Sequence, residues 1–396
     1  MRLYQEVRRI RRVGAVSDQL IEIEAVQICW PYSGCWRVGF RRVQFVPRAG
    51  EGRGVAKPGK VTLSDVAKAA GVSSGTVSNT INRPESVADA TRRRVQAAIR
   101  QLGFVPNEGA ARLRSGSSRL LGLVVPDIAS SFYAEIAKGV ARRAEEHGHA
   151  MLLFDTGDDL DREVRQLETL ARHRSIGALI APRMADERHL RRLRALDMHL
   201  VLIDRPASEH DGCSVSIDDL QGGRMAARHL VVLGRRRLAF VAGPVGVPQA
   251  ERRLQGFRDA VAADEVSVEP AVVHADSSDF LGGGEAARAL LAMDPRPDGV
   301  FCVNDQLAVG VVNELTRAGL RVPQDVAVVG YGDTSVARSA SVPLTTVRQP
   351  MSDLGRAAVD HLIRESEGVA ESRMHHHSST VFQPSLVVRE SAPLPE

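Results

Sequence analysis

The strongest constraint on the fold is a regular alternation of apolar runs and amphipathic segments over residues 120–333. Apolar runs such as LLGLVVP, which starts at Leu120, are typical of strands that are buried on both faces. The segments between them place apolar residues at helical spacing. Strands that alternate with helices predict an α/β fold of doubly wound parallel sheets. We predict strands over 120–126, 150–155, 176–182, 199–204, 237–243, 271–276, 299–305 and 325–333, and helices over 132–147, 160–171, 222–233, 250–262, 284–292 and 307–318.

These elements fall into two successive sets, one before and one after Asp218. Each set predicts one lobe, and ligands of open parallel sheets bind beyond the carboxyl ends of the strands. The cleft between the lobes is therefore the predicted binding site. The glycines Gly282–Gly284 are expected to precede a helix, but their spacing is not that of a phosphate-binding loop.

A separate helical unit is predicted at residues 61–82, VTLSDVAKAAGVSSGTVSNTIN. Thr62 is a favourable N-cap with Asp65 three residues later, and Gly71 follows the apolar stripe where a helix ends. Ser73 caps a second helix, which carries small polar side chains on its outer faces. Such a face can enter the major groove of DNA. On spacing alone, the alternative is a helical hairpin whose Ser and Thr residues are only solvated.

Charge is divided unevenly along the chain. Residues 1–118 carry 20 Lys and Arg against 9 Asp and Glu, whereas residues 119–396 carry 32 against 39. Lys and Arg contacts to a polyanion release counterions, so the basic segment indicates a nucleic-acid partner. A solvated basic surface is the alternative.

Composition excludes several other classes of protein. The 43% hydrophobic and 25% charged content is ordinary for a soluble globular chain. Charged residues interrupt every stretch that would reach the roughly 18 residues of a membrane helix, and no export signal is found, so we expect a cytoplasmic protein without a membrane partner.

The four cysteines lack C-x-x-C spacing, and His375–His377 lie in a Ser-rich stretch that we expect to be a solvated loop. No catalytic motif stands out. We predict no enzymatic activity, no cofactor and no metal site.

Residues 1–60 differ from the rest of the chain. They hold both tryptophans, show little periodicity and end in a Gly-, Pro- and Arg-rich stretch. We expect this segment to be poorly ordered, or to precede a true translation start near Val55.

Several motifs together resemble those of the lactose-repressor/galactose-repressor (LacI/GalR) family of bacterial transcription regulators. They are VTLSDVAKAAGVSSGTVSNTIN, RRRVQAAIRQLGFVPN, AARLRSG, LLGLVVPDI, AGP, RRLQGF, NDQLAVG and DVAVVGYGD. The resemblance covers about residues 61–389. It implies a helix-turn-helix domain (61–106), a hinge helix and linker (107–118) and a two-lobed core that is similar to periplasmic sugar-binding proteins (119–396).

The function that the resemblance implies is transcriptional repression. A homodimer or homotetramer would bind a pseudo-palindromic double-stranded operator, and a small-molecule effector such as a sugar would control its affinity. The identity of the sugar, a non-sugar effector and corepressor logic all stay open. The alternative is a solute-binding protein of the periplasmic sugar-binding type, which would have an export signal and no helix-turn-helix.

The resemblance also implies which residues contact DNA. Leu113 matches the leucine that relatives insert into the minor groove, where an apolar wedge kinks the duplex. Packing of Leu113 on the core is the alternative. Hydroxyl and amide side chains of the second helix suit phosphates and base edges. The implied DNA-binding residues are Thr62, Ser73, Ser74, Gly75, Thr76, Ser78, Asn79, Asn107 and Leu113.

The effector site is implied in the same way. Aromatic faces can stack on a sugar, while Arg, Asn and Asp can fix its hydroxyls. Gly332 stands where many relatives have an aspartate, so one carboxylate of the usual set is missing. The implied effector-binding residues are Phe132, Tyr133, Arg253, Asn304, Asp305, Asp333 and Gln349.

Overall fold

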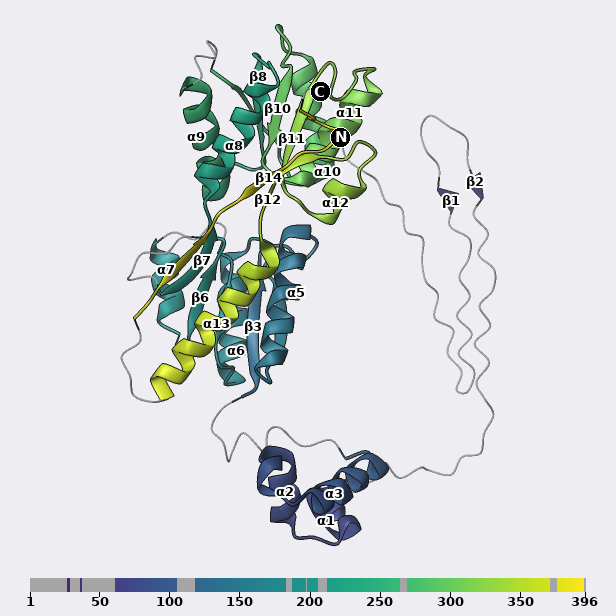
Figure 1. Cartoon of the computed structure of the whole chain (residues 1–396), viewed down its shortest axis with the longest axis vertical. Coiled ribbons are helices and arrows are strands. Elements are labelled where there is room, and N and C mark those ends of the chain that lie inside the picture. Colours follow the sequence, from purple (N-terminus) through teal and green to yellow (C-terminus); the bar gives the residue numbers. More distant parts are fainter. Residues whose placement is uncertain are drawn as a thin grey trace. The chain divides into compact units, whose positions relative to one another are not determined.

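The computed structural model divides the chain into two compact units, Met1–Val105 and Pro106–Glu396, and each is described by itself (Figure 1). The structure describes residues 27–28, 36–37, 61–104, 118–182, 187–196, 198–205, 212–263, 269–370 and 376–394. The predicted hinge, with Asn107 and Leu113, lies outside these ranges. Residues 1–60, which we expect to be poorly ordered, also lie outside the described ranges, apart from two short antiparallel strands, β1 (Gln27–Ile28) and β2 (Trp36–Arg37).

Over residues 61–104, the first unit consists of three helices and a short 3-10 turn. They are α1 (Leu63–Ala70), α2 (Ser74–Asn82), η1 (Pro84–Ser86) and α3 (Asp89–Leu102). Thr62 and Asp65 form the predicted capping box, and Gly71 ends α1 at a φ of 64°, in the left-handed region. The inward faces of the helices share one small apolar core, made of Val66, Ala67, Ala70, Val77, Val95, Ala98 and Phe104.

The second unit contains two six-stranded sheets, each the centre of one lobe. In lobe one the strand order is β13-β7-β6-β5-β3-β4, and all pairings are parallel. Its elements are β3 (Leu120–Val125), α5 (Ser131–Glu146), β4 (Ala150–Asp155), α6 (Leu160–Arg172), β5 (Ala178–Ile180), α7 (Glu187–Arg194), β6 (Leu200–Ile203), β7 (Cys213–Ile217), α13 (Met351–Ala370) and β13 (Ser379–Phe382).

Lobe two repeats the same plan with the order β14-β12-β11-β10-β8-β9, in which only β14 pairs antiparallel. Its central strand β8 is buried throughout, as expected of a parallel sheet covered on both faces. The elements are α8 (Asp219–Val232), β8 (Leu238–Ala242), α9 (Pro248–Ala263), β9 (Ala271–His274), α10 (Phe280–Leu291), β10 (Gly299–Cys302), α11 (Asp305–Arg317), β11 (Ala327–Gly332), α12 (Ser335–Ser339), β12 (Thr345–Arg348) and β14 (Ser385–Val387).

The α/β fold class predicted from the sequence is confirmed, but the two lobes are not two consecutive segments of chain. After β12 the chain returns to lobe one, where α13 packs against α5 and β13 joins the edge of the sheet beside β7. Figure 1 shows the yellow C-terminal segment then running from lobe one to lobe two, where β14 completes the second sheet. The chain therefore crosses between the lobes three times.

The predicted position of the glycines Gly282–Gly284 was wrong. Helix α10 begins at Phe280 and contains all three of them. The reason for Gly283 is close packing on α11: a Cβ there would overlap the carbonyl oxygen of Leu307, and Gly310 faces it from the other helix. Gly283 and Gly310 therefore let the two helices approach, and none of the three glycines of α10 lies in a loop.

Candidate functional site

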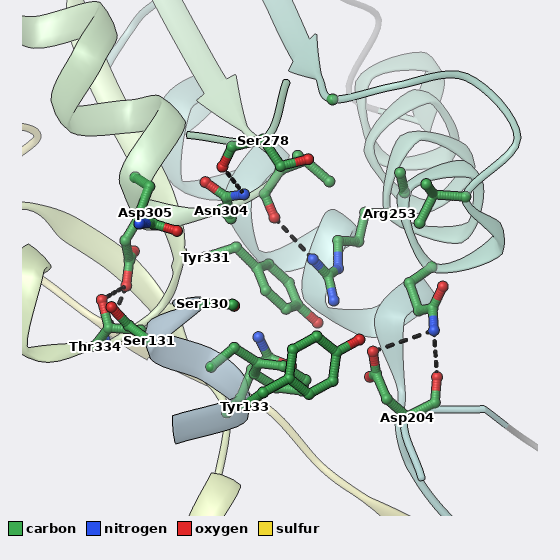
Figure 2. Close-up of a pocket in the computed structure, with 18 of the residues that line it drawn as sticks. Ser130, Ser131, Tyr133, Asp204, Arg253, Ser278, Asn304, Asp305, Tyr331 and Thr334 are labelled. Carbon is green, nitrogen blue, oxygen red and sulfur yellow. Dashed lines mark hydrogen bonds between the residues drawn. The ribbon is translucent and has the colours of Figure 1, made fainter. Parts of the chain in front are cut away.

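A pocket opens between the two lobes at the carboxyl ends of their strands, where the topology predicts one. Figure 2 shows side chains converging on it from both lobes. Lobe one supplies the start of α5 and the residue that follows β6, and lobe two supplies the ends of β10 and β11. The lining residues include Phe132, Tyr133, Asp204, Gln249, Arg253, Asn304, Asp305, Tyr331 and Gln349.

Six of the seven residues that the sequence predicted for the effector line this pocket. They are Phe132, Tyr133, Arg253, Asn304, Asp305 and Gln349. Asp333 is not among the lining residues, and the structure gives its carboxylate other partners. Its carboxylate accepts hydrogen bonds from Arg348 at 2.7 Å and Arg389 at 2.5 Å, so it joins α12, β12 and the C-terminal segment within lobe two.

Two of the residues that are predicted to bind the effector form most of their side-chain hydrogen bonds within the protein. Asn304 caps α11 by accepting from the amide of Leu307, and it donates to the carbonyl oxygen of Ser278. Asp305 accepts bonds from Thr346 at 2.6 Å and from both the amide and the hydroxyl of Thr334 at 2.8 Å. Burial nevertheless raises the pKa of Asp305. These two side chains shape the floor of the pocket.

Arg253 lies at the centre of a buried network. Its Nε donates to Asp219 at 2.7 Å, its Nη1 donates to the carbonyl oxygen of Val303, and its guanidinium lies over the ring of Tyr331. Burial opposes the charge on Arg253, but Asp219 and Tyr331 outweigh it and raise its pKa. The Tyr331 hydroxyl donates to the same Asp219 oxygen. The network fixes the orientation of the arginine before any ligand arrives.

Sequence reasoning missed Asp204, which follows β6 in lobe one. It has a φ of 58°, a left-handed conformation that is uncommon outside glycine and is often found at ligand sites. Its Oδ2 accepts from the amide of Gln249 at 3.1 Å. Burial, reinforced by Asp219, raises the pKa of Asp204 to about 8. A polar residue directly after a buried strand, as Asp204 is after β6, is a sequence signal that could have identified it.

Three buried oxygens of the pocket have no hydrogen-bond partner among the described residues. They are Asp204 Oδ1, Gln249 Oε1 and Gln349 Oε1. Buried polar atoms are rarely left unpaired in folded proteins. The pocket is therefore prepared for a ligand that brings several polar groups.

In the first unit, α2 carries five of the residues predicted to contact DNA. Ser74, Gly75 and Asn79 are exposed, and Thr76 and Ser78 are half-buried. The Ser73 side chain caps the helix by accepting from the amide of Thr76, as Thr62 caps α1. Asn82, at the end of the same helix, donates back to the carbonyl oxygen of Ser78. The helix therefore presents Ser74 and Asn79 outward.

A helix-turn-helix unit joined to a two-lobed core with a polar pocket defines a DNA-binding regulator that responds to a small molecule. A family model described as "Bacterial regulatory proteins, lacI family" matches residues 62–107, and one for a periplasmic binding protein-like domain matches residues 227–392. The ribose operon repressor of Escherichia coli (strain K12) is 35% identical over 306 residues, which cover 76% of this chain and 92% of that protein.

Solved structures agree with the sequence comparison. The lac repressor dimer bound to operator and the anti-inducer ONPF has a TM-score of 0.73 at 28% identity, and covers 84% of this chain and 99% of its own. The complex of the transcriptional regulator CelR with cellobiose has a TM-score of 0.63 at 33% identity, with the same coverage.

The chain therefore belongs to the lacI family of bacterial regulatory proteins, as the sequence motifs predicted. It is a DNA-binding transcriptional repressor whose activity a small molecule controls. Throughout the described ranges, no helix is long and apolar enough to cross a membrane.

Proposed function

We propose that this repressor binds a polyhydroxylated small molecule, of the size and polarity of a sugar, in the pocket between its lobes. The observation that carries the proposal is the set of three unpaired buried oxygens, on Asp204, Gln249 and Gln349. Ligand hydroxyls can donate to such oxygens, and the guanidinium of Arg253 can donate to a ligand oxygen. The names of the relatives fit this class, because they include a ribose operon repressor and a regulator bound to cellobiose.

The proposed ligand contacts come from both lobes. Asp204 belongs to lobe one, whereas Gln249 and Arg253 lie on α9 of lobe two. A ligand that satisfies both sets stabilises one relative arrangement of the lobes, and only such a difference in affinity shifts a conformational equilibrium. We infer that this arrangement is transmitted through residues 107–118, the predicted hinge, to the helix-turn-helix domain at 61–106.

On the DNA side, we propose that a homodimer places two copies of α2 in successive major grooves of a pseudo-palindromic operator. Ser74 and Asn79 are exposed and suited to base edges or phosphates. The lac repressor, a similar protein, is a dimer bound to operator in its solved structure. Such a regulator acts at the chromosome, in the cytoplasm. The predicted roles of Asn107 and Leu113 in the hinge stay predictions.

We infer that the pocket binds its ligand without transforming it. Acid–base or nucleophilic catalysis needs groups with access to the reacting atom. Of the two carboxylates that line the pocket, Asp305 is bound on both oxygens by threonines, so Asp204, with one free oxygen, has no second free carboxylate beside it. Arg253 is likewise held by Asp219. Recovery of a screened sugar in chemically changed form after incubation with the purified chain would refute this inference.

The experiment that tests the proposal is a DNA-binding titration with the region upstream of the gene, with and without a panel of sugars and sugar phosphates. We expect specific binding, and a change in affinity of at least tenfold with one member of the panel. Calorimetry of that compound with the chain alone should give one site per protomer. Binding that none of the polyols alters, together with a strong response to an apolar metabolite, would overturn the proposed ligand class.

A further inference from the structure

A cluster of metal-ligating side chains lies at the opposite end of lobe one from the pocket. Cys213 is the first residue of β7, Glu365 lies on α13, and His377 precedes β13. One ligand atom from each lies within 4.8 Å of the other two. The pocket residue Asp204 follows the carboxyl end of β6, whereas this cluster is at the amino ends of neighbouring strands. The two sites are therefore separate.

The geometry of the cluster is close to that of a tetrahedral metal centre. The Sγ of Cys213 lies 3.9 Å from the Nδ1 of His377. Bond lengths of a zinc site with S, N and O ligands place neighbouring ligand atoms about 3.6 Å apart. A movement of about 1 Å or less per side chain therefore brings all three atoms to one ion.

Glu365 supplies the observation that points to a ligand. It is only 8% exposed, and its Oε2 has no hydrogen-bond partner among the described residues. Its other oxygen, Oε1, lies 3.3 Å from Nδ1 of His199, the residue before β6. The imidazole thus orients the carboxylate from one side, as outer partners of metal ligands commonly do, and Oε2 is left for another partner.

The loop that carries His377 is held in place by its neighbours. His361, one turn before Glu365 on α13, bonds to the hydroxyls of Ser378 at 3.3 Å and Thr380 at 2.9 Å. The amide of Ser214 donates to the carbonyl oxygen of Ser378. The three candidate ligands therefore sit on elements whose relative positions the fold fixes, which lowers the cost of ordering them around an ion.

We propose that Cys213, Glu365 and His377 bind a divalent transition-metal ion, with Zn²⁺ favoured. A thiolate, an imidazole and a carboxylate together suit a borderline-soft ion better than Mg²⁺ or Ca²⁺, which prefer oxygen ligands. The ion links β7, α13 and the loop before β13, so it fastens the returning C-terminal segment to lobe one. The sequence did not predict the site, because its ligands are far apart in the chain and only the histidines are adjacent.

The test uses the full chain, freed of metal by a chelator and titrated with Co²⁺ in place of Zn²⁺. We expect a thiolate-to-cobalt charge-transfer band and the intense visible bands of a tetrahedral centre, both lost on addition of Zn²⁺. Cys213→Ala should abolish the charge-transfer band, whereas Cys302→Ala, which changes a buried cysteine of lobe two, should retain it. Absence of the band in the unmodified chain, or its persistence in Cys213→Ala, would overturn the proposal.

A second pair of variants keeps the test decisive if Cys213→Ala does not fold. His377→Ala changes an exposed residue and should lower Co²⁺ affinity at least tenfold, while His376→Ala, at the adjacent exposed histidine, should change it less than twofold. Equal affinities for the two variants would refute the role of His377. Glu365→Gln preserves the shape of the side chain and should also weaken binding at least tenfold; unchanged binding would remove Glu365 from the site.

Discussion

The guanidinium carbon of Arg253 lies 3.7 Å from the centre of the Tyr331 ring, and both side chains bond to the same oxygen of Asp219. Cation–π stacking and a buried ion pair therefore act together on one arginine. The pocket wall is thus rigid on the side of lobe two. A ligand that bonds to Arg253 meets a guanidinium whose conformational entropy the fold has already removed.

Arg253→Ala should impair folding stability as well as the effector response. Removing the arginine leaves the Asp219 carboxylate buried without its partner, and breaking such a pair typically costs about 3–5 kcal/mol. Adding Asp219→Asn removes the uncompensated charge and should restore a large part of the loss. Denaturant unfolding of the single and double variants measures this. If the double variant is less stable than Arg253→Ala, the ion pair is not the source of the loss.

The stability of the protein should depend on pH through Asp204. Burial, with the Asp219 charge, raises its pKa in the folded state to about 8, whereas an unfolded aspartate titrates near pH 4. The folded state holds the proton more tightly, so the stabilisation is complete below about pH 4 and is lost as the pH rises to about 8.

Asp204→Asn cannot ionise and should remove this dependence. Relative to the unmodified chain, the variant should gain stability between pH 5 and pH 8, by about 1.4 kcal/mol per pH unit at most. Unfolding at several pH values gives the slopes. Asp276→Asn, at an exposed aspartate beyond β9, is the control and should not gain in this way. Parallel slopes for the two variants would argue against a raised pKa at Asp204.

Local sequence patterns predicted the fold well where the residues of an element carry its signal, such as an apolar run or a helix cap. The strand at Ala150–Asp155 was predicted to the residue, and α1 and α2 begin directly after their predicted caps. The elements after Asp333 were not predicted, because their places depend on pairing with strands far away in the chain. Helix α13, which returns to lobe one, is an example: its partner α5 lies more than 200 residues earlier.

The site shows the same limit. Motifs identified Arg253 and Asn304 as pocket residues. They did not show that the Asn304 side chain caps α11 and bonds to the carbonyl oxygen of Ser278. The motif that contains Tyr331 does not predict that its ring lines the pocket, because a tyrosine at the end of a buried strand usually lies in the core. Only the packed structure shows which polar atoms are left without partners. Those atoms, and not the motif alone, indicate the chemistry of the ligand.

Gln349→Ala should weaken binding of the effector about tenfold without lowering stability. Its Oε1 is buried and unpaired in the pocket, so the variant loses a bond that forms only with ligand, worth about 1–2 kcal/mol. Gln255→Ala is the matched control, because Gln255 is exposed on α9 and bonds to Asp259. Calorimetry with the responsive sugar compares the two. Equal affinities would remove Gln349 from the ligand shell.

Asp333→Asn should reduce stability and leave effector affinity within about twofold of the unmodified chain. The side chain is 3% exposed and pairs with Arg348 and Arg389, so loss of its charge leaves those guanidinium groups poorly satisfied, at about 1–3 kcal/mol. Asparagine tolerates the left-handed backbone at this position, so the change tests the charge alone. A large drop in effector affinity at unchanged stability would restore the ligand role that the sequence suggested.

Asn79 and Asn82 provide a matched pair on one helix for testing how α2 meets DNA. Both are exposed, but Asn82 donates to the carbonyl oxygen and the hydroxyl of Ser78, whereas the described structure gives Asn79 no such internal bond. Asn79→Ala should therefore weaken binding to the specific operator by about 1–3 kcal/mol and leave binding to unrelated DNA nearly unchanged, since base contacts carry specificity and phosphate contacts do not. Asn82→Ala should alter the helix end and affect both kinds of DNA alike. If the two variants lose specific affinity equally, recognition depends on the position of α2 and not on a base contact by Asn79. The specificity then has to come from the hinge and from the deformability of the operator, because the side chains of α2 are small.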